Sequence, residues 1–576
     1  MPVIILDKKV VNEVVDSLKE ASESVADPRI KNIFTGLFKL VEVLASDNEK
    51  LTTDNQQLKN EINKLKGEQG KPDIKPNNRN KKDISSERER KDDDNESGGG
   101  KQKNSHNKKR NRKPKLPNIK IDRKHKCEID KSILPSDAIN KGFTYTVIQD
   151  IKIVTDNVKY CRETYYSPSL NKTFLAPLPK GVAGKGEFGV GVRALIPLFK
   201  SQCHLPESAI LTFFRHFGIQ TSAAYISNQW TAGYEQFNQE KEDIVTAGIS
   251  SGSYQQIDDT GARVNGNNHY THVLCNPYYS AFFTTKHKDR LTVLDIFRNF
   301  SPREFIYNDY TNELLDIFKL PKKHLKRIDK SFDRNVVIDE VCFDALLATL
   351  KLGPLQRRRV KEAFAIAAYR VQTAIPVIGS LICDDAPQFK LLTETLGLCW
   401  VHDGRHYKKL NPILTDNKRI LDEFLTQYWV FYHQLRAYKA APNTIDKDSL
   451  AKRFDELFKT VTDYDLLNER IAKTWAKRKE LLACLEQPEL PLHNNASELA
   501  ARVQARARDI SLHTKSAAGT KIKDSMMTIS QTAKKLGVNT YEYIKDRLSG
   551  EFKLPSLAEL ILQSSSSDER LFANTT

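Results

Sequence analysis

The stretch Tyr254-Gln-Gln-Ile-Asp-Asp-Thr-Gly-Ala-Arg-Val-Asn-Gly-Asn-Asn-His-Tyr-Thr-His-Val-Leu-Cys275 decides the fold. It contains two alternating runs separated by Asn265-Gly266, a dipeptide typical of tight hairpin turns. A third apolar run follows at residues 279–285. The sequence therefore predicts an antiparallel meander of three strands, with Asp258 and Asp259 at the end of the first.

A second apolar strand is predicted at residues 375–383, and it also ends in two acids, Asp384 and Asp385. Carboxylates at the ends of buried strands are costly unless they are paired, and a divalent cation is the usual partner of several converging acids. One such pair alone is more often an ordinary strand-end turn. The two pairs together predict a metal site, for which Asp309, after residues 305–308, is a rival acid.

A third acid lies in Pro491-Leu-His-Asn-Asn-Ala-Ser-Glu498. Asn495 can cap a helix and Glu498 falls three residues later, which is the spacing of a capping box. Arg502 lies one turn further on the same helical face, so Glu498 is also a carboxylate flanked by a cation suited to phosphate. Both roles, helix cap and site acid, are open to Glu498.

Residues 206–230 form two helical stretches separated by Gly218-Ile-Gln220. Thr221 or Ser222 is placed to cap the second helix. The pattern fits a helix-turn-helix, although an ordinary helical hairpin has the same pattern. The basic surroundings favour DNA binding, which makes Thr221 and Ser222 candidate DNA contacts.

The formal net charge of +17 indicates a polyanionic partner. Residues 101–126 hold twelve Lys or Arg and one acid, and residues 71–100 contain almost no apolar side chains. We therefore predict a disordered basic linker over residues 67–126. A merely solvating linker is the alternative. The candidate DNA contacts in it are Lys108, Lys109, Arg110, Arg112 and Lys113.

Five leucines recur every seven residues before the linker: Leu37, Leu44, Leu51, Leu58 and Leu65. Asn48 and Asn55 occupy two of the intervening a positions, which lowers stability but favours two strands in register. The sequence predicts a homodimer through residues 34–65. A single amphipathic helix packed on its own chain is the alternative.

Several classes of protein are excluded. The longest apolar stretches, such as residues 375–383, are far shorter than the roughly 20 residues of a membrane span, and the N-terminus does not form a secretory signal. The eight cysteines lie at least sixteen positions apart, which supports neither a disulfide framework nor a CxxC zinc knuckle. We expect a cytoplasmic protein without a membrane partner.

Three motifs taken together resemble the DDE transposases of insertion-sequence family sixty-six, a family of bacterial mobile elements. They are Ile257-Asp-Asp-Thr-Gly-Ala-Arg-Val-Asn-Gly266, Cys383-Asp-Asp-Ala-Pro-Gln-Phe389 with Cys399-Trp-Val-His402, and residues 491–498. The likeness extends to the N-terminal helix, the basic linker and residues 532–541, and so covers most of the chain.

The resemblance implies an α/β fold with an RNase H-like catalytic core and two Mg²⁺ ions per active site. Asp258, Asp384 and Glu498 would be the catalytic acids and metal ligands. Asp259, Asp385, His402 and Arg502 would support them. Asp384 is preferred to Asp309 because Cys399-Trp-Val-His402 follows it at the right distance.

The catalytic acids are 126 and 114 positions apart, which is more than a minimal core needs, so each gap must contain an insertion. The predicted order begins with a helix and coiled coil (1–66), the linker (67–126) and a small β module (127–180) with strands at 143–147, 151–154 and 173–175. A helix-turn-helix-like region (181–250) follows. The first core part (251–410) contains an insertion at about 310–372. It is followed by a helical insertion (411–487) and by the second core part with C-terminal helices (488–576).

Two departures from the family matter. The family often has a cysteine-rich zinc module before the helix-turn-helix region, but only Cys127 and Cys161 lie near it here, so the β module is a degenerate zinc ribbon and zinc is not expected. His493 replaces an aspartate, and Leu499 replaces the arginine expected after the glutamate.

The leading hypothesis is a Mg²⁺-dependent transposase that cuts the ends of an insertion sequence and joins the freed 3′-hydroxyl to target DNA. Its partners would be double-stranded DNA, in the bacterial nucleoid, and accessory proteins of the same element. The alternatives are a catalytically inactive DNA-binding or regulatory derivative, and an RNase H-like nuclease that cleaves without joining.

Overall fold

The computed structural model describes residues 17, 27–65, 120–179, 182, 188–412, 414–510 and 512–573. Most of the predicted basic linker lies outside these residues, and so do its candidate DNA contacts Lys108, Lys109, Arg110, Arg112 and Lys113. Among the described residues, no helix has the length and apolar character needed to span a bilayer.

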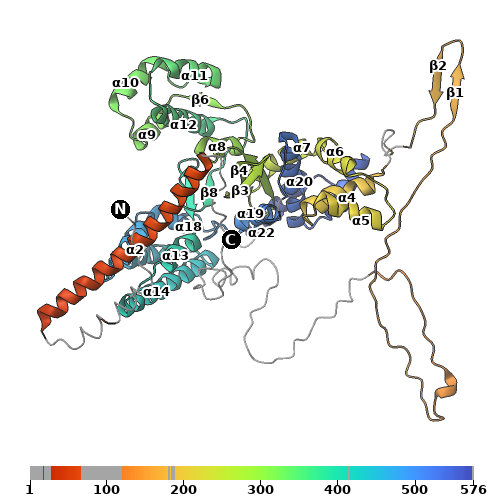
Figure 1. The fold of residues 1–576 in the computed structure, drawn as a ribbon, viewed down its shortest axis with the longest axis horizontal. Coiled ribbons are helices and arrows are strands. Elements are labelled where there is room, and N and C mark those ends of the chain that lie inside the picture. The colour runs from red at the N-terminus through yellow and green to blue at the C-terminus, as the bar shows by residue number, and fades with distance from the viewer. Residues whose placement is uncertain are drawn as a thin grey trace.

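A mixed sheet of five strands forms the centre of an α/β fold (Figure 1). Its strands are β3 (Tyr254–Val264), β4 (Asn267–Cys275), β5 (Ser280–Thr285), β8 (Ser380–Cys383) and β9 (Thr395–Leu398). They are ordered β5-β4-β3-β8-β9. The first three form an antiparallel meander, whereas β8 runs parallel to both β3 and β9.

The predicted meander is confirmed, and its turn shows why the sequence signal was strong. Asn265 and Gly266 have φ angles of 47° and 76°, the left-handed conformation that a two-residue hairpin turn requires and that Asn and Gly tolerate. The second predicted strand is shorter than expected, since β8 begins at Ser380. Pro376 lacks the N–H that a paired strand needs, so the chain enters the sheet only after it.

Helices cover the sheet on the face that carries Asp258. α19 (Asn495–Asp509) packs on β3 and β4, and α20 (Ala517–Lys535) packs on β5. Val273 and Phe282 of the sheet share a buried cluster with Ala500 of α19 and Met527 of α20. The opposite face is apolar as well, because Ile257 and Leu274, which alternate with Asp258 and Val273 along their strands, are fully buried.

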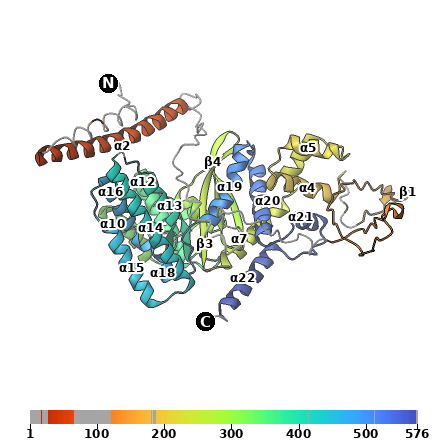
Figure 2. The same ribbon diagram turned by 90° about the horizontal axis from the view of Figure 1, so that it is seen from below.

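Two mainly helical segments are inserted into the sequence of the core, and both lie on one side of the sheet (Figure 2). The first, between β5 and β8, contains α8 (Arg290–Phe297), β6 (Glu304–Ile306), α9 (Asp309–Ile317), α10 (Lys322–Ser331), β7 (Val337–Asp339), α11 (Glu340–Thr349) and α12 (Pro354–Val371). The second follows β9 and contains α13 (Trp400–Lys408), α14 (Thr415–Ala440), α15 (Thr444–Phe458), α16 (Asp465–Trp475), α17 (Arg478–Leu481) and α18 (Ala483–Glu486).

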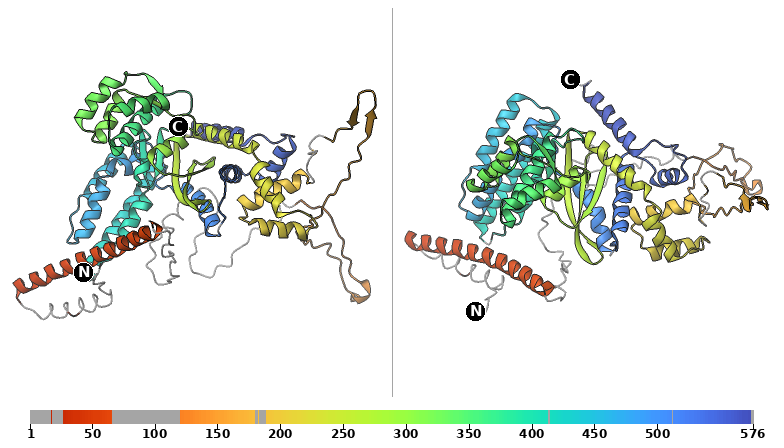
Figure 3. Two further views of the ribbon diagram at one scale, coloured as in Figure 1. Left: turned by 45° about the horizontal axis from the view of Figure 1, so that its top comes forward. Right: turned by 90° about the horizontal axis from the view of Figure 1, so that it is seen from above.

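A helical region lies at the other end of the sheet (Figure 3). It consists of α4 (Val190–Ser201), α5 (Glu207–His216), α6 (Ala223–Ala232), α7 (Gln236–Ser250), α21 (Thr540–Ser549) and α22 (Leu557–Ala573). The C-terminal helices close it, because α21 packs on α4 and α22 packs on α7. The hydroxyls of Ser201 and Ser530 are 2.8 Å apart, which ties α4 to α20 as well.

The β module predicted at 127–180 is only partly present. β1 (Thr164–Ser167) and β2 (Lys172–Leu175) form a hairpin, and η3 (Lys131–Ile133) is a short 3-10 turn. Residues 143–147 and 151–154 are not strands, so this prediction is wrong. Apolar alternation alone does not make a strand stable; a paired neighbour and a covered face are needed as well, and Tyr145 and Ile151 are exposed.

The heptad segment is one continuous helix, α2 (Pro28–Leu65). Leu37, Leu44, Leu51 and Leu58 are all exposed, at 42% to 58% of their surface. Within the described part of the chain these four leucines are therefore uncovered, against the alternative that α2 packs on its own chain. Pairing with a second copy stays a prediction.

Candidate active site

The pairing of β3 with β8 places Asp258 and Asp384 at the same height along the two strands. Asp258 lies in β3, and Gln256 of β3 is paired with Ile382 of β8 in parallel register. Asp258 is two positions after Gln256, and Asp384 is two positions after Ile382. The two carboxylates are therefore at corresponding positions along neighbouring strands. The prediction that Asp258 and Asp259 end the first strand is wrong, because pairing with β4 continues β3 to Val264 and leaves both acids in its middle. Asp384 directly follows the last residue of β8, as predicted.

Glu498 reaches the same site from above the sheet, in the first turn of α19. Its Oε1 is 3.5 Å from Nδ1 of His402, and its Oε2 is 3.6 Å from Nη2 of Arg405. Both of these residues lie on α13. The Glu498 side chain is only 11% exposed, so the helices hold it against the sheet.

The predicted capping box at Asn495 is wrong. Asn494 is the residue that precedes the helix, and it makes no side-chain cap hydrogen bond among the described residues. Asn495 is already helical, and its N–H donates to Nδ1 of His493 at 3.3 Å. Asn495 is therefore not the N-cap residue of α19, and Glu498 stays a candidate site acid.

The pKa values of the acids show that their charges interact. Burial raises the pKa of Asp258 to about 7, with further contributions from the negative charges of Asp384 and Glu498. Burial likewise raises the pKa of Asp384. The N–H of Ala386, which donates to Oδ1 of Asp384 at 3.1 Å, acts in the opposite direction but does not cancel the effect of burial. The ionised form of Asp258 is thus disfavoured both by burial and by the two neighbouring carboxylates.

The second acid of each pair is held differently. Asp259 is 3.4 Å from Nζ of Lys288 and accepts a hydrogen bond from Gln388 at 2.7 Å. Asp385 lies between two lysines, with Lys390 at 2.6 Å and Lys477 at 2.5 Å. Burial acts to raise the pKa of Asp385, but these cations bring it below its usual value. Both acids are thus neutralised by the protein itself.

The remaining predicted residues have the following positions. Arg502 is exposed on α19. Ser222 caps α6 by accepting from the N–H of Tyr225 at 3.1 Å, so it and not Thr221 is the cap. The rival acid Asp309 begins α9 in the first insertion, where it is 91% exposed and 2.6 Å from Arg334.

Four cations that contact these acids were not predicted: Lys288, Lys390, Arg405 and Lys477. Arg405 follows His402 by three positions, so helical spacing could have placed both on one face of α13. Lys288 lies three residues after the end of β5, but its contact with Asp259 of β3 joins residues 29 positions apart, which no local sequence pattern predicts.

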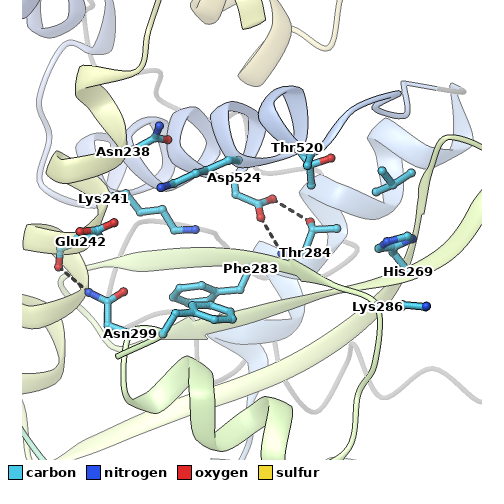
Figure 4. Close-up of a pocket in the computed structure, with 14 residues that line it drawn as sticks. Asn238, Lys241, Glu242, His269, Phe283, Thr284, Lys286, Asn299, Thr520 and Asp524 are labelled. Carbon is cyan, nitrogen blue, oxygen red and sulfur yellow. Dashed lines mark hydrogen bonds between the residues drawn. The ribbon is translucent and has the colours of Figure 1, made fainter. Parts of the chain in front are cut away.

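A separate cavity of about 430 Å³ lies at the β5 edge of the sheet, between α7 and α20 (Figure 4). Asp524 accepts hydrogen bonds there from the N–H of Thr284 at 2.6 Å and from its hydroxyl at 2.8 Å. Lys241 lies over the ring of Phe283, with its Nζ 4.3 Å from the ring centre. The hydrogen bonds of Asp524 join α20 to the edge strand, which is a structural role.

Comparison with known proteins agrees with this architecture. Residues 358–522 match the family model described as Transposase IS66 family, a range that includes Asp384 and Glu498. The chain is similar to the uncharacterized protein y4jO of Sinorhizobium fredii, with 31% identity over 307 residues, which are 53% of this chain and 94% of that protein. No solved structure matches. The chain belongs to the IS66 family of transposases.

Proposed function

We propose that this protein is a DDE DNA transposase with an RNase H-like core, in which Asp258, Asp384 and Glu498 are the catalytic acids. The observation that carries the proposal is the proximity of the three carboxylates. Burial, together with the negative charges of Asp384 and Glu498, raises the pKa of Asp258 to about 7. A mixed five-stranded sheet with acids on its central strands supports the proposed core. Membership of the family supports DNA as the substrate.

The donor set fits Mg²⁺, which prefers carboxylate oxygens. Asp258 interacts with both other acids and would be shared between two ions, while Asp384 and Glu498 would each hold one. When bound, the ions would activate a water or a 3′-hydroxyl and stabilise the leaving oxygen. The same site could then cut the ends of the element and join them to target DNA.

Neighbouring residues orient the acids and meet the phosphates. His402 and Arg405 hold the two oxygens of Glu498 in place. Arg508 of α19 donates to Thr260 at 3.4 Å and to the carbonyl of Gly261 at 3.3 Å, so it joins α19 to β3 just beyond Asp258. The exposed Arg502 of the same helix would be a candidate contact for DNA phosphates.

Other segments would provide binding. α5 and α6, with the cap at Ser222, would read the terminal repeats, and the basic linker would add affinity that does not depend on sequence. α2 would pair with a second copy, and accessory proteins of the element would complete the assembly. The exposed leucine stripe of α2 supports the pairing.

A strand-transfer assay with Mg²⁺ and the ends of the element tests the proposal. Wild-type protein should cut and join, whereas Asp258→Asn should do neither. Asp309→Asn is the matched control, because this exposed acid lies in the first insertion and should leave activity unchanged. Equal products from wild type and Asp258→Asn would show that the reaction does not depend on Asp258 and would overturn the proposed site. No products from either would favour the inactive DNA-binding derivative, and cleavage without joining would indicate a nuclease.

A further inference from the structure

A cysteine, a histidine and a glutamate meet beside the three acids. Cys399 immediately precedes α13, His402 lies in its first turn, and Glu498 lies in the first turn of α19. One ligand atom from each residue lies within 4.8 Å of the other two. Cys399 is only 2% exposed, so its thiol belongs to the interior of the site and not to the surface.

Backbone hydrogen bonds fix the positions of these residues. The N–H of Cys399 donates to the carbonyl of Cys383 at the end of β8, at 3.0 Å. The N–H of Trp400 donates to the carbonyl of Leu492, just before α19, at 2.9 Å. The start of α13 is therefore tied both to the strand that leads to Asp384 and to the loop that leads to Glu498, which gives the cluster a built framework.

The separations suit a tetrahedral cation. Zinc binds histidine nitrogen and carboxylate oxygen at about 2.0–2.2 Å and thiolate sulfur at about 2.3 Å, so its ligand atoms lie roughly 3.3–3.6 Å apart. Nδ1 of His402 and Oε1 of Glu498 are already 3.5 Å apart. Three protein ligands with an open fourth position is the arrangement of zinc sites that accept a further ligand.

The ligand types select a different metal from the one proposed for catalysis. Thiolate and imidazole favour Zn²⁺ and related cations, whereas Mg²⁺ prefers oxygen alone. Glu498 has one oxygen near His402 and the other near Arg405. Its Oε1 is therefore placed to join the thiol and the imidazole while Arg405 keeps the carboxylate oriented.

We propose that Cys399, His402 and Glu498 form a binding site for a thiophilic divalent cation such as Zn²⁺, and that this site shares Glu498 with the proposed Mg²⁺ site. Occupation by Zn²⁺ takes Glu498 away from catalysis, so Zn²⁺ inhibits at concentrations far below that of Mg²⁺. The inhibition rests on the proposed transposase function, but the binding does not.

Titration of the full chain with Co²⁺, a spectroscopic substitute for Zn²⁺, tests the binding. Wild-type protein should develop a thiolate-to-cobalt charge-transfer band that Zn²⁺ then displaces. Cys399→Ser should lose this band. Cys484→Ser is the matched control, since Cys484 is 3% exposed and lies on α18, outside the cluster. Both variants retain the exposed cysteines Cys127, Cys161, Cys203 and Cys342, so comparing the two variants cancels any signal from those residues.

Two further variants keep the test decisive if Cys399→Ser does not fold. His402→Ala and Glu498→Gln should each weaken Co²⁺ binding at least about tenfold, the lower end of the cost of losing even an outer-shell partner. Unchanged cobalt affinity in both, or a charge-transfer band that survives in Cys399→Ser, would overturn the proposed site.

The inhibition has its own assay. Zn²⁺ should suppress Mg²⁺-dependent strand transfer by wild type, and Cys399→Ser should need at least about tenfold more Zn²⁺ for the same suppression. Equal sensitivity of both proteins would show that Zn²⁺ does not act through Cys399. If no strand transfer occurs with Mg²⁺ alone, the transposase function fails while the cobalt titration, including that of Asp258→Asn, still decides the metal site.

Discussion

Replacing Asp258 with asparagine should stabilise the metal-free protein at neutral and alkaline pH. Burial raises the pKa of Asp258 from an ordinary 3.8 to about 7, helped by the charges of Asp384 and Glu498. An acid whose pKa is higher in the folded state than in the unfolded state destabilises the fold once it ionises. Asparagine removes that charge, and its side-chain oxygen can still accept the hydrogen bond that the N–H of Asp259 donates at 2.9 Å.

The size and the pH window follow from the same pKa values. Each unit of pKa difference is worth about 1.4 kcal/mol, so ionised Asp258 destabilises the folded state by up to about 4 kcal/mol. The cost is absent below the ordinary pKa of 3.8, grows as the pH rises, and is complete above about 7. The advantage of Asp258→Asn should therefore be larger at pH 8 than at pH 5, by roughly 2–3 kcal/mol at most.

Thermal unfolding at the two pH values, with and without Mg²⁺, measures this effect. About 1 kcal/mol shifts the Tm of a 150–250-residue domain by roughly 2–4 °C, so the variant should gain several degrees at pH 8. Mg²⁺ should stabilise wild type more than Asp258→Asn, and Asp309→Asn should behave like wild type. A variant that is destabilised equally at both pH values would refute the reasoning, because the pKa of Asp258 would then not be raised by burial and by the two neighbouring carboxylates.

Three other perturbations test separate parts of the structure. Leu51→Glu with Leu58→Glu should convert a dimer to a monomer in sedimentation velocity, and a wild-type monomer would contradict the pairing of α2. Ser222→Ala should lower the free energy of unfolding, measured by denaturant titration, by about 1 kcal/mol. An unchanged free energy of unfolding would show that the cap of α6 does not stabilise the protein. Asp403→Ala should cost about 3–5 kcal/mol, because Asp403 is buried beside Arg470 and accepts from Thr474 at 2.8 Å; a loss below 1 kcal/mol would argue against a buried ion pair.

The sheet and two of the three acids could be predicted from the sequence because their signals are local. The turn at Asn265-Gly266 and the alternation around it specify a hairpin within 22 residues. The apolar run before Asp384 specifies a strand end. Parallel pairing then places Asp258 and Asp384 at the same level without further information.

Other features could not be predicted, because they depend on contacts between distant segments. Lys477 contacts Asp385 at 2.5 Å although 92 positions separate them. The start of α19 depends on the loop held by Trp400 through the carbonyl of Leu492. That loop places Asn494, and not Asn495, immediately before the helix. A capping pattern in the sequence cannot show which of two adjacent asparagines the tertiary structure selects.

The second insertion takes part in building the site, and α13 shows how. One side of this helix presents His402 and Arg405 to Glu498. Asp403, between them in sequence, faces into the insertion, where it pairs with Arg470 and lies 3.7 Å from Lys477.

Lys477 connects this insertion to the second acid pair. Its Nζ also contacts Asp385, directly after Asp384. The orientation of α13, and with it the position of Glu498, is therefore linked to the strand end that carries Asp384 through the half-buried Lys477, in addition to the backbone hydrogen bond between Cys399 and Cys383. Changes at Arg470 or Lys477 should consequently alter two of the three acids, although both residues lie in a helical segment that contributes none of them.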